Sequence, residues 1–197
     1  MDALKAIMTR RSTRRYKDKP VEDDLLNEII EAGRYAPSGG NSQTNHFFVI
    51  TDKQILNKLV YMVQDAFSRM EVYEGMYKSM ANSITLSKTG NYVFHYNAPC
   101  LIVMANRKDY GNNFADVACA LENMMIYANA KDLGSCWINQ LRWLNENEEL
   151  LELFYSFGMK EDERVYGALA LGYPDSENGL PERRTIERKG NEVTYIR

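Results

Sequence analysis

Four arginines and two hydroxyl side chains occupy six consecutive positions near the start of the chain, in the segment Arg10–Arg15, which reads RRSTRR. Guanidinium groups are rigid, permanently charged forks that match phosphate oxygens, and short hydroxyl side chains add further donors. The segment therefore predicts a site for one phosphate group. The plainer interpretation is a charged surface that contacts only water.

The charge of the whole chain helps to decide whether the ligand is a small phosphorylated molecule or a nucleic acid. The 197 residues carry a net charge of -3, and acidic residues follow RRSTRR within ten positions. A protein that binds duplex nucleic acid normally has an extended basic face. A small phosphorylated ligand is therefore favoured, and a nucleic-acid or phosphoprotein binding module remains the non-enzymatic alternative.

Three later segments could surround such a ligand. The run from Ala36 to Gln43 (APSGGNSQ) is rich in small residues, which let a backbone approach a planar ligand closely. The stretch Leu133–Gln140 (LGSCWINQ) predicts a strand whose end could offer backbone N–H groups to a heterocycle. Leu180–Thr185 (LPERRT) carries a second pair of arginines. Taken singly, the three segments are explained as an ordinary loop, a buried strand and surface charge. They indicate a ligand site only if the fold brings them together.

Several familiar sites are absent from the sequence. It contains no GxGxxG or GxxxxGK(S/T) phosphate-binding motif and no GxSxG nucleophile elbow. Only two histidines occur, and Cys100, Cys119 and Cys136 lack CxxC spacing, so we expect no metal site. We expect these thiols to be buried and reduced in a cytoplasmic protein, with no histidine or lysine near Cys136 to make it a nucleophile. No apolar run approaches the roughly 20 residues that span a bilayer, so no membrane partner is expected.

The hydrophobic pattern predicts an α+β fold in a single domain over residues 1–197. Predicted helices cover 3–9, 21–36, 53–86 with breaks near Gly75 and Asn82, 114–131, and a segment from an Asn145–Glu148 capping box to Phe157. Predicted strands cover 47–51, 100–105, 135–138 and 165–171. Such few, irregular strands favour a mixed sheet flanked by helices. The tail from about 178 to 197 has few apolar residues to bury, and we expect it to lie on another subunit.

Six segments, in this order and spacing, resemble the nitroreductase family of FMN-dependent oxidoreductases. They are RRSTRRYKDKPV, EAGRYAPSGGNSQTNHFFVI, NAPCLIVMA, FADVACALENMMIYANAKDLGSCWI, ALALGYP and PERRTIE. The resemblance implies an intertwined homodimer with FMN at the subunit interface. It also implies a mostly antiparallel sheet, flanked by helices and often completed by the C-terminal tail of the partner.

The resemblance also implies which residues bind FMN. They are Arg10, Arg11, Ser12 and Arg14 for the phosphate and ribityl chain; Pro37, Ser38, Gly39, Asn41 and Gln43 from the partner's loop; Ile138, Asn139 and Gln140 along the ring; and Arg183, with Arg184, as a second phosphate ligand. Many members have Glu-Gly where this chain has Asn139-Gln140, so a backbone group is expected to contact the ring there.

The implied activity is hydride transfer from NADH or NADPH, through FMN, to a small organic acceptor such as a nitroaromatic or a quinone. No side chain is expected to act as a catalytic acid or base, because the cofactor carries the chemistry. The runner-up enzyme classes are a flavin reductase and a metabolite-specific reductive enzyme of the same fold. Residues 60–95 match no motif of the family, so the sequence does not indicate the acceptor.

Overall fold

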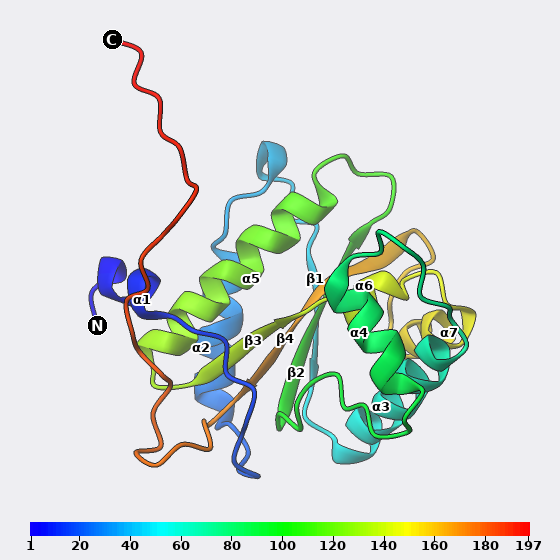
Figure 1. Ribbon diagram of the computed structural model, residues 1–197. Helices are drawn as coiled ribbons and strands as arrows, with labels where there is room; N and C mark the ends of the chain where they lie inside the picture. Colours follow the sequence, from blue (N-terminus) through cyan, green and yellow to red (C-terminus); the bar gives the residue numbers. More distant parts are fainter.

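A four-stranded sheet forms the centre of the molecule, and helices cover both of its faces (Figure 1). The computed structural model describes all 197 residues. Its elements are α1 (Ala3–Thr9), α2 (Asp23–Arg34), the 3-10 turn η1 (Gly39–Asn41), β1 (His46–Ile50), α3 (Lys53–Ser68), α4 (Lys78–Ser87), β2 (Cys100–Arg107), α5 (Asn113–Ala130), β3 (Gly134–Ile138), α6 (Gln140–Trp143), α7 (Glu148–Ser156) and β4 (Glu163–Gly172).

The strands lie in the order β1-β2-β4-β3, and every neighbouring pair is antiparallel. The long strands β2 and β4 are therefore central, while β1 and β3 form the two edges. The predicted α+β fold, a mostly antiparallel sheet flanked by helices, is confirmed.

Side chains that alternate along the strands build two cores. From β2, Leu101 and Val103 face the side covered by α3, α4, α6 and α7, whereas Ile102 and Met104 face α2 and α5. All four are fully buried. A strand buried on both faces must be apolar at successive positions, which explains why this strand reads as an unbroken apolar run.

The helix predictions fail at three points. Residues 53–86 split into α3 and α4 near Gly75, which has a φ of +84°, but α4 runs through Asn82, so the predicted break there is wrong. The last helix is capped by Asn147, whose side chain accepts a hydrogen bond from Leu150 N, and not by Asn145. Asn145 instead donates to Val165 O. The sequence pattern does not predict the short helix α6.

Two of the three cysteines are buried, and Cys119 is exposed on the outer side of α5. The prediction of three buried thiols is wrong for Cys119, because α5 contacts the body along one face only. Burial raises the pKa of the Cys100 thiol to about 12. The molecule has no group of three or more potential metal-ligating side chains, and none of its helices combines the length and apolar character that crossing a bilayer requires.

The tail beyond β4 contains no helix or strand. Its last residues extend away from the body in Figure 1, and Val193, Tyr195 and Ile196 are each at least 70% exposed. An apolar segment that finds no core in its own chain is compatible with an interface. That the tail lies on another subunit stays a prediction.

His95, in the segment between α4 and β2, is a buried imidazole. It is 4% exposed, and neither ring nitrogen has a hydrogen-bond partner. Burial disfavours the charged form and lowers the pKa of His95 to about 4. The neutral ring is therefore the form that the folded protein accommodates.

Acid should destabilise the fold through His95. The unfolded chain has the ordinary histidine pKa, near 6.5, so it binds more protons than the folded chain as the pH falls below that value. We expect the free energy of unfolding to drop by roughly 2–3 kcal/mol from this group between pH 7 and 4.5. Urea denaturation at both pH values should show a smaller drop for His95→Leu than for the wild type. Equal drops would contradict this role.

Candidate functional site

The N-terminal arginine segment docks on β3, one edge of the sheet. Thr13 N donates to Ser135 O over 2.9 Å, and the Tyr16 hydroxyl donates back to Thr13 O over 2.8 Å. A Cβ atom on Gly134 would lie 2.6 Å from the Thr13 side chain, so glycine is required for this close approach. RRSTRR and LGSCWINQ, which are more than a hundred residues apart in the sequence, are thus neighbours.

The tail reaches the same region through Asn129, a buried residue in the last turn of α5. The Asn129 side chain donates to Ala6 O over 2.9 Å and to Thr9 Oγ1 over 3.2 Å, which fixes the end of α1. Asn129 Oδ1 accepts from Arg183 Nε over 3.2 Å, and the Arg183 guanidinium also pairs with Asp132. The second arginine group is therefore attached beside the end of α1, next to the first group, and that both groups hold one phosphate stays a prediction.

The Arg11 guanidinium has donors that bond to nothing. Nη1 donates to Arg10 O, but Nε and Nη2 are shut off from water and have no partner. Burial lowers the pKa of Arg11, and the positive charges of Arg188, Arg10 and Arg184 lower it further. A half-buried cation with two unpartnered donors, near three other arginines and one acidic side chain, Glu182, is costly. An anion with several acceptor oxygens, such as a phosphate, fits these donors.

The other arginines of the segment have looser surroundings. Arg10 Nε lies 3.9 Å from Glu122 Oε1 on α5, and the Arg14 guanidinium lies 5.8 Å from the centre of the Tyr96 ring. Neither contact fully uses the donors of a guanidinium. Both side chains can therefore contribute to a ligand site beside β3.

The residues at the end of β3 already bond to one another. Asn139 Oδ1 accepts from Trp137 Nε1 over 2.9 Å, and Asn139 N donates to Gln140 Oε1 over 3.1 Å. Gln140 Nε2 donates to the Tyr92 hydroxyl over 2.6 Å, which ties β3 to the segment after α4. That Ile138, Asn139 and Gln140 contact a ring stays a prediction, and the side-chain amide of Gln140 is directed into the protein.

The loop Pro37–Gln43 is organised by Asp116, at the other end of α5. The Asp116 carboxylate accepts from Gly39 N over 3.1 Å, and the Tyr110 hydroxyl lies 3.1 Å from the same carboxylate. Gly40, Asn41 and Gln43 all have φ between 51° and 58°, a left-handed conformation that glycine and asparagine tolerate best.

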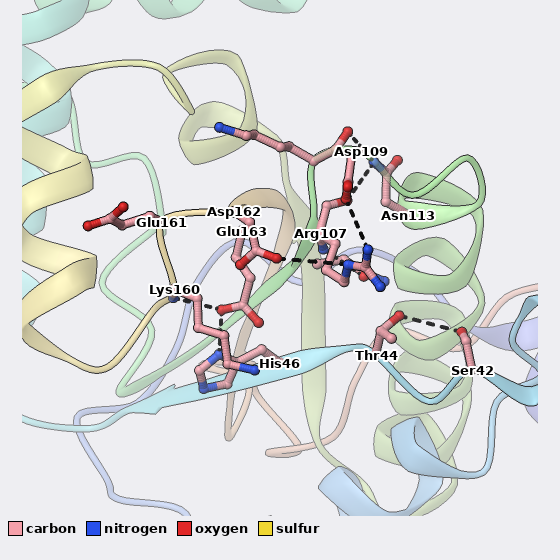
Figure 2. Close-up of polar contacts among 12 residues, drawn as sticks. Ser42, Thr44, His46, Arg107, Asp109, Asn113, Lys160, Glu161, Asp162 and Glu163 are labelled. Atoms are coloured by element: carbon pink, nitrogen blue, oxygen red, sulfur yellow. Dashed lines mark hydrogen bonds and ion pairs between the residues drawn. The ribbon is translucent and has the colours of Figure 1, made fainter.

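A second polar cluster holds the end of the sheet beside this loop (Figure 2). His46 Nδ1 of β1 lies 2.9 Å from Glu163 Oε2 of β4, and Lys160 N donates to the same carboxylate over 3.0 Å. Ser42 and Thr44, which lead into β1, lie beside the start of α5 in this view. The cluster fixes the start of β1, where the chain leaves the loop.

One protomer brings together only part of the predicted site. Asp116 and Asn129 are 13 positions apart on α5, which corresponds to about 20 Å along the helix axis. Arg183 bonds at the Asn129 end, and Ser12 pairs with Ser135 at the start of β3, whereas Arg10 lies beside Glu122 in the middle of α5. The loop with Pro37, Ser38, Gly39, Asn41 and Gln43 lies at the Asp116 end.

Sequence reasoning missed the polar residues that position these parts, chiefly Asp116, Asn129 and Tyr16. A signal for Asn129 was present, because it follows Leu121 and Met125 at intervals of four residues on the buried stripe of α5. A polar residue on an apolar stripe needs a hydrogen-bond partner. No such pattern marks Tyr16, whose hydroxyl bonds to the backbone.

Comparison with known proteins gives a consistent result. The model of the nitroreductase family matches residues 7–173. A nitrobenzene nitroreductase from Ectopseudomonas oleovorans is 25% identical over 207 aligned positions, covering 90% of this chain and 88% of the relative. The structure of a nitroreductase with bound FMN from Bacteroides fragilis superposes with a TM-score of 0.86 at 32% identity, covering 100% of both chains. An FMN-bound nitroreductase from Desulfitobacterium hafniense, at 22% identity and full coverage of both chains, has the same fold with a TM-score of 0.81.

Asp116→Asn should release the loop. The amide keeps one acceptor oxygen but places an NH2 group where the carboxylate receives donors, so we expect hydrogen exchange at the Gly39 amide to accelerate at least tenfold. The free energy of unfolding should fall by about 1–3 kcal/mol. Asp109→Asn, a change at a side chain that is 65% exposed, is the matched control and should alter neither quantity. Unchanged exchange at Gly39 in Asp116→Asn would show that the carboxylate does not hold the loop.

Proposed function

The chain belongs to the nitroreductase family, and we propose that it is an FMN-dependent oxidoreductase that passes hydride from NADH or NADPH to a small organic acceptor. Nitroaromatics and quinones are the acceptors that we propose to test first. The single observation that carries the cofactor assignment is that two buried donors of Arg11, Nε and Nη2, have no partner. A phosphate ester supplies the acceptors that these donors lack.

The chain's own residues would bind and orient the cofactor. The proposed ligands of the phosphate and ribityl chain are Arg10, Arg11, Ser12, Arg14, Arg183 and Arg184; those beside the ring are Ile138, Asn139 and Gln140; and those from the partner's loop are Pro37, Ser38, Gly39, Asn41 and Gln43. When bound, FMN supplies the redox chemistry by accepting a hydride from the nicotinamide and reducing the acceptor. Backbone N–H groups at the end of β3 would fix the ring edge, and no side chain need donate or remove a proton.

The separation of the loop from the arginines supports a homodimer. A two-fold axis that places two α5 helices antiparallel would bring the loop end of one helix to the arginine end of the other. The outer side of α5 suits such a contact, because Phe114, Ala115 and Cys119 are exposed there and all three are apolar or small. We propose that each flavin site is completed by the partner's loop.

The open edge of the sheet offers a place for the partner's tail. β1 has no neighbour on its outer side, and residues His46–Asp52 line a groove there with Ile55 and Phe157. An uncovered edge strand presents unpaired backbone N–H and C=O groups. The exposed segment Val193–Ile196 has the alternation of a strand and could pair with this edge.

The purified protein should be yellow, and acid should release a chromophore that is identified as FMN. Under anaerobic conditions NADH or NADPH should bleach the visible flavin absorption, and adding a nitroaromatic or a quinone should restore it. Comparing steady-state rates with these acceptors and with free flavin separates the proposed activity from a flavin reductase. A colourless protein that gains no flavin spectrum when FMN is supplied would contradict the proposal.

Complementation tests whether two chains share each site. We expect Arg10→Gln and Asn41→Ala to lower FMN occupancy severalfold when each is expressed alone, because one removes a guanidinium and the other strains a left-handed loop position. When the two chains are co-expressed, mixed dimers should regain one intact site of two. Restored occupancy of about half in the isolated mixed dimer supports a shared site. No restoration would mean that each site is built within one chain.

A further inference from the structure

A cavity of about 300 Å³ opens at the end of the sheet where β1 stops and β2 starts. Its wall comes from three segments that are far apart in the sequence: the chain just after RRSTRR, the first turns of α3, and the segment that leads into β2. None of the residues that line it belongs to the proposed cofactor site. The cavity is therefore a separate feature of the fold.

Part of the cavity wall is formed by two rings that pack on the sheet. Tyr16 and Pro99 both line the cavity. A Cβ atom on Gly172, at the end of β4, would lie 3.1 Å from Tyr16 Cδ1 and 2.6 Å from Pro99 Cδ, so both rings lie directly against the strand backbone. The Tyr16 hydroxyl is already used, because it donates to Thr13 O over 2.8 Å. These flat, apolar surfaces suit a flat ligand.

His95 gives the cavity a polar group without a partner. It lines the cavity, is 4% exposed, and neither of its ring nitrogens has a hydrogen-bond partner. Buried polar groups are normally paired in folded proteins, so an unpaired one points to a missing partner. Because no hydrogen bond holds the ring, rotation about the Cβ–Cγ bond can exchange its nitrogen and carbon positions. A ligand in the cavity can then supply the partner.

The charges around the cavity favour a neutral ligand. Lys53 Nζ lies 2.7 Å and 2.9 Å from the two carboxylate oxygens of Asp18, so these two lining residues balance each other. Both side chains are more than 70% exposed, so the pair costs little to open. Burial lowers the pKa of His95 to about 4, and its imidazole is therefore neutral near neutral pH. The cavity thus has no uncompensated positive charge for an anion.

We propose that this cavity binds a neutral, flat molecule that carries an amide group, with N–H beside C=O, and that His95 and Asn57 contact its polar edge. A neutral imidazole offers one donor and one acceptor, which matches such an edge. The side-chain amides of Asn57 and Asn97, which are exposed lining residues, offer the same two kinds of group. The volume is at the lower end for ligand pockets and suits a single ring rather than a dinucleotide.

Two kinds of compound carry this edge on a single ring. One is an aromatic carboxamide such as nicotinamide, and the other is a cyclic imide such as the pyrimidine base uracil. Nicotinate is the anionic counterpart of nicotinamide, and orotate is uracil with an added carboxylate. Comparing each neutral compound with its anion tests the ligand class, and comparing the two neutral compounds identifies the source of the amide.

The small number of histidines gives a direct readout of the site. NMR of the full-length protein with isotope-labelled histidine shows only two imidazole rings, those of His46 and His95. Millimolar nicotinamide or uracil should shift the ring signals of His95 and leave those of His46, which does not line the cavity, unchanged. Nicotinate and orotate should shift neither ring. The measurement needs no turnover and is insensitive to binding elsewhere on the protein.

Two variants test the proposed contacts. Asn57→Ala removes an exposed side chain, so it should fold normally, and it should weaken binding about fivefold, the loss expected for one hydrogen bond. Gln54→Ala is the matched control, since Gln54 is an exposed amide of the same helix that does not line the cavity, and it should keep the affinity within twofold. His95→Leu should abolish binding when the signals of the ligand are followed instead.

Each outcome supports or overturns the site. A shift of the His95 signals by either neutral compound supports it and identifies the source of the amide. If neither compound shifts them, or if Asn57→Ala or His95→Leu binds as tightly as the wild type, the proposal is wrong. If the anions shift His95 as strongly as the amides, the ligand is not a neutral amide and the proposal also fails. None of these results depends on whether the protein binds FMN, so the proposed function is tested separately.

Discussion

Two buried donors of the Arg11 guanidinium that have no hydrogen-bond partner are the constraint on which the proposed site depends, and they lie near the place where the tail attaches to α5. The Nε and Nη2 donors of Arg11 are hidden from water and bond to nothing in the protein. A folded protein tolerates such a group only when something else neutralises it. The surrounding contacts of Asn129, Thr13 and Tyr16 all hold the backbone so that this charge stays in place.

The sheet and α5 each hold different parts of the proposed site in place. The two edge strands of the sheet differ: RRSTRR lies along β3, whereas β1 has no neighbour on its outer side. The helix carries one buried polar residue near each end, and each of them organises one part of the site. Asp116 shapes the loop, and Asn129 joins α1 to the tail. Both parts of the proposed site are therefore attached to one helix, and in the proposed homodimer the two-fold axis would unite them.

Much of this could be read from the sequence because its signals are local. The strands β2 and β4 are apolar at successive positions, and glycine, proline and asparagine mark the loop before β1. The end of the chain and the site geometry could not be predicted in the same way. Which carboxylate holds Gly39, or which arginine is already paired, depends on contacts between residues far apart in the sequence.

The cap at Asn147 was missed because Asn145 offered an equally good pattern two residues earlier. The exposure of Cys119 depends on which side of α5 meets the body, and periodicity alone does not fix that for a helix with apolar residues on most of its surface.

The spacing along α5 restricts where the length of the chain can change during evolution. One extra residue between Asp116 and Asn129 would turn everything beyond it by about 100° and shift it by about 1.5 Å, so at least one of the two side chains would leave its partners. The connection between α3 and α4, residues 69–77, carries no such requirement and is exposed over most of its length. Lineages that acquire new acceptors should therefore insert or delete residues in that connection, while the count of residues in the long helix stays constant.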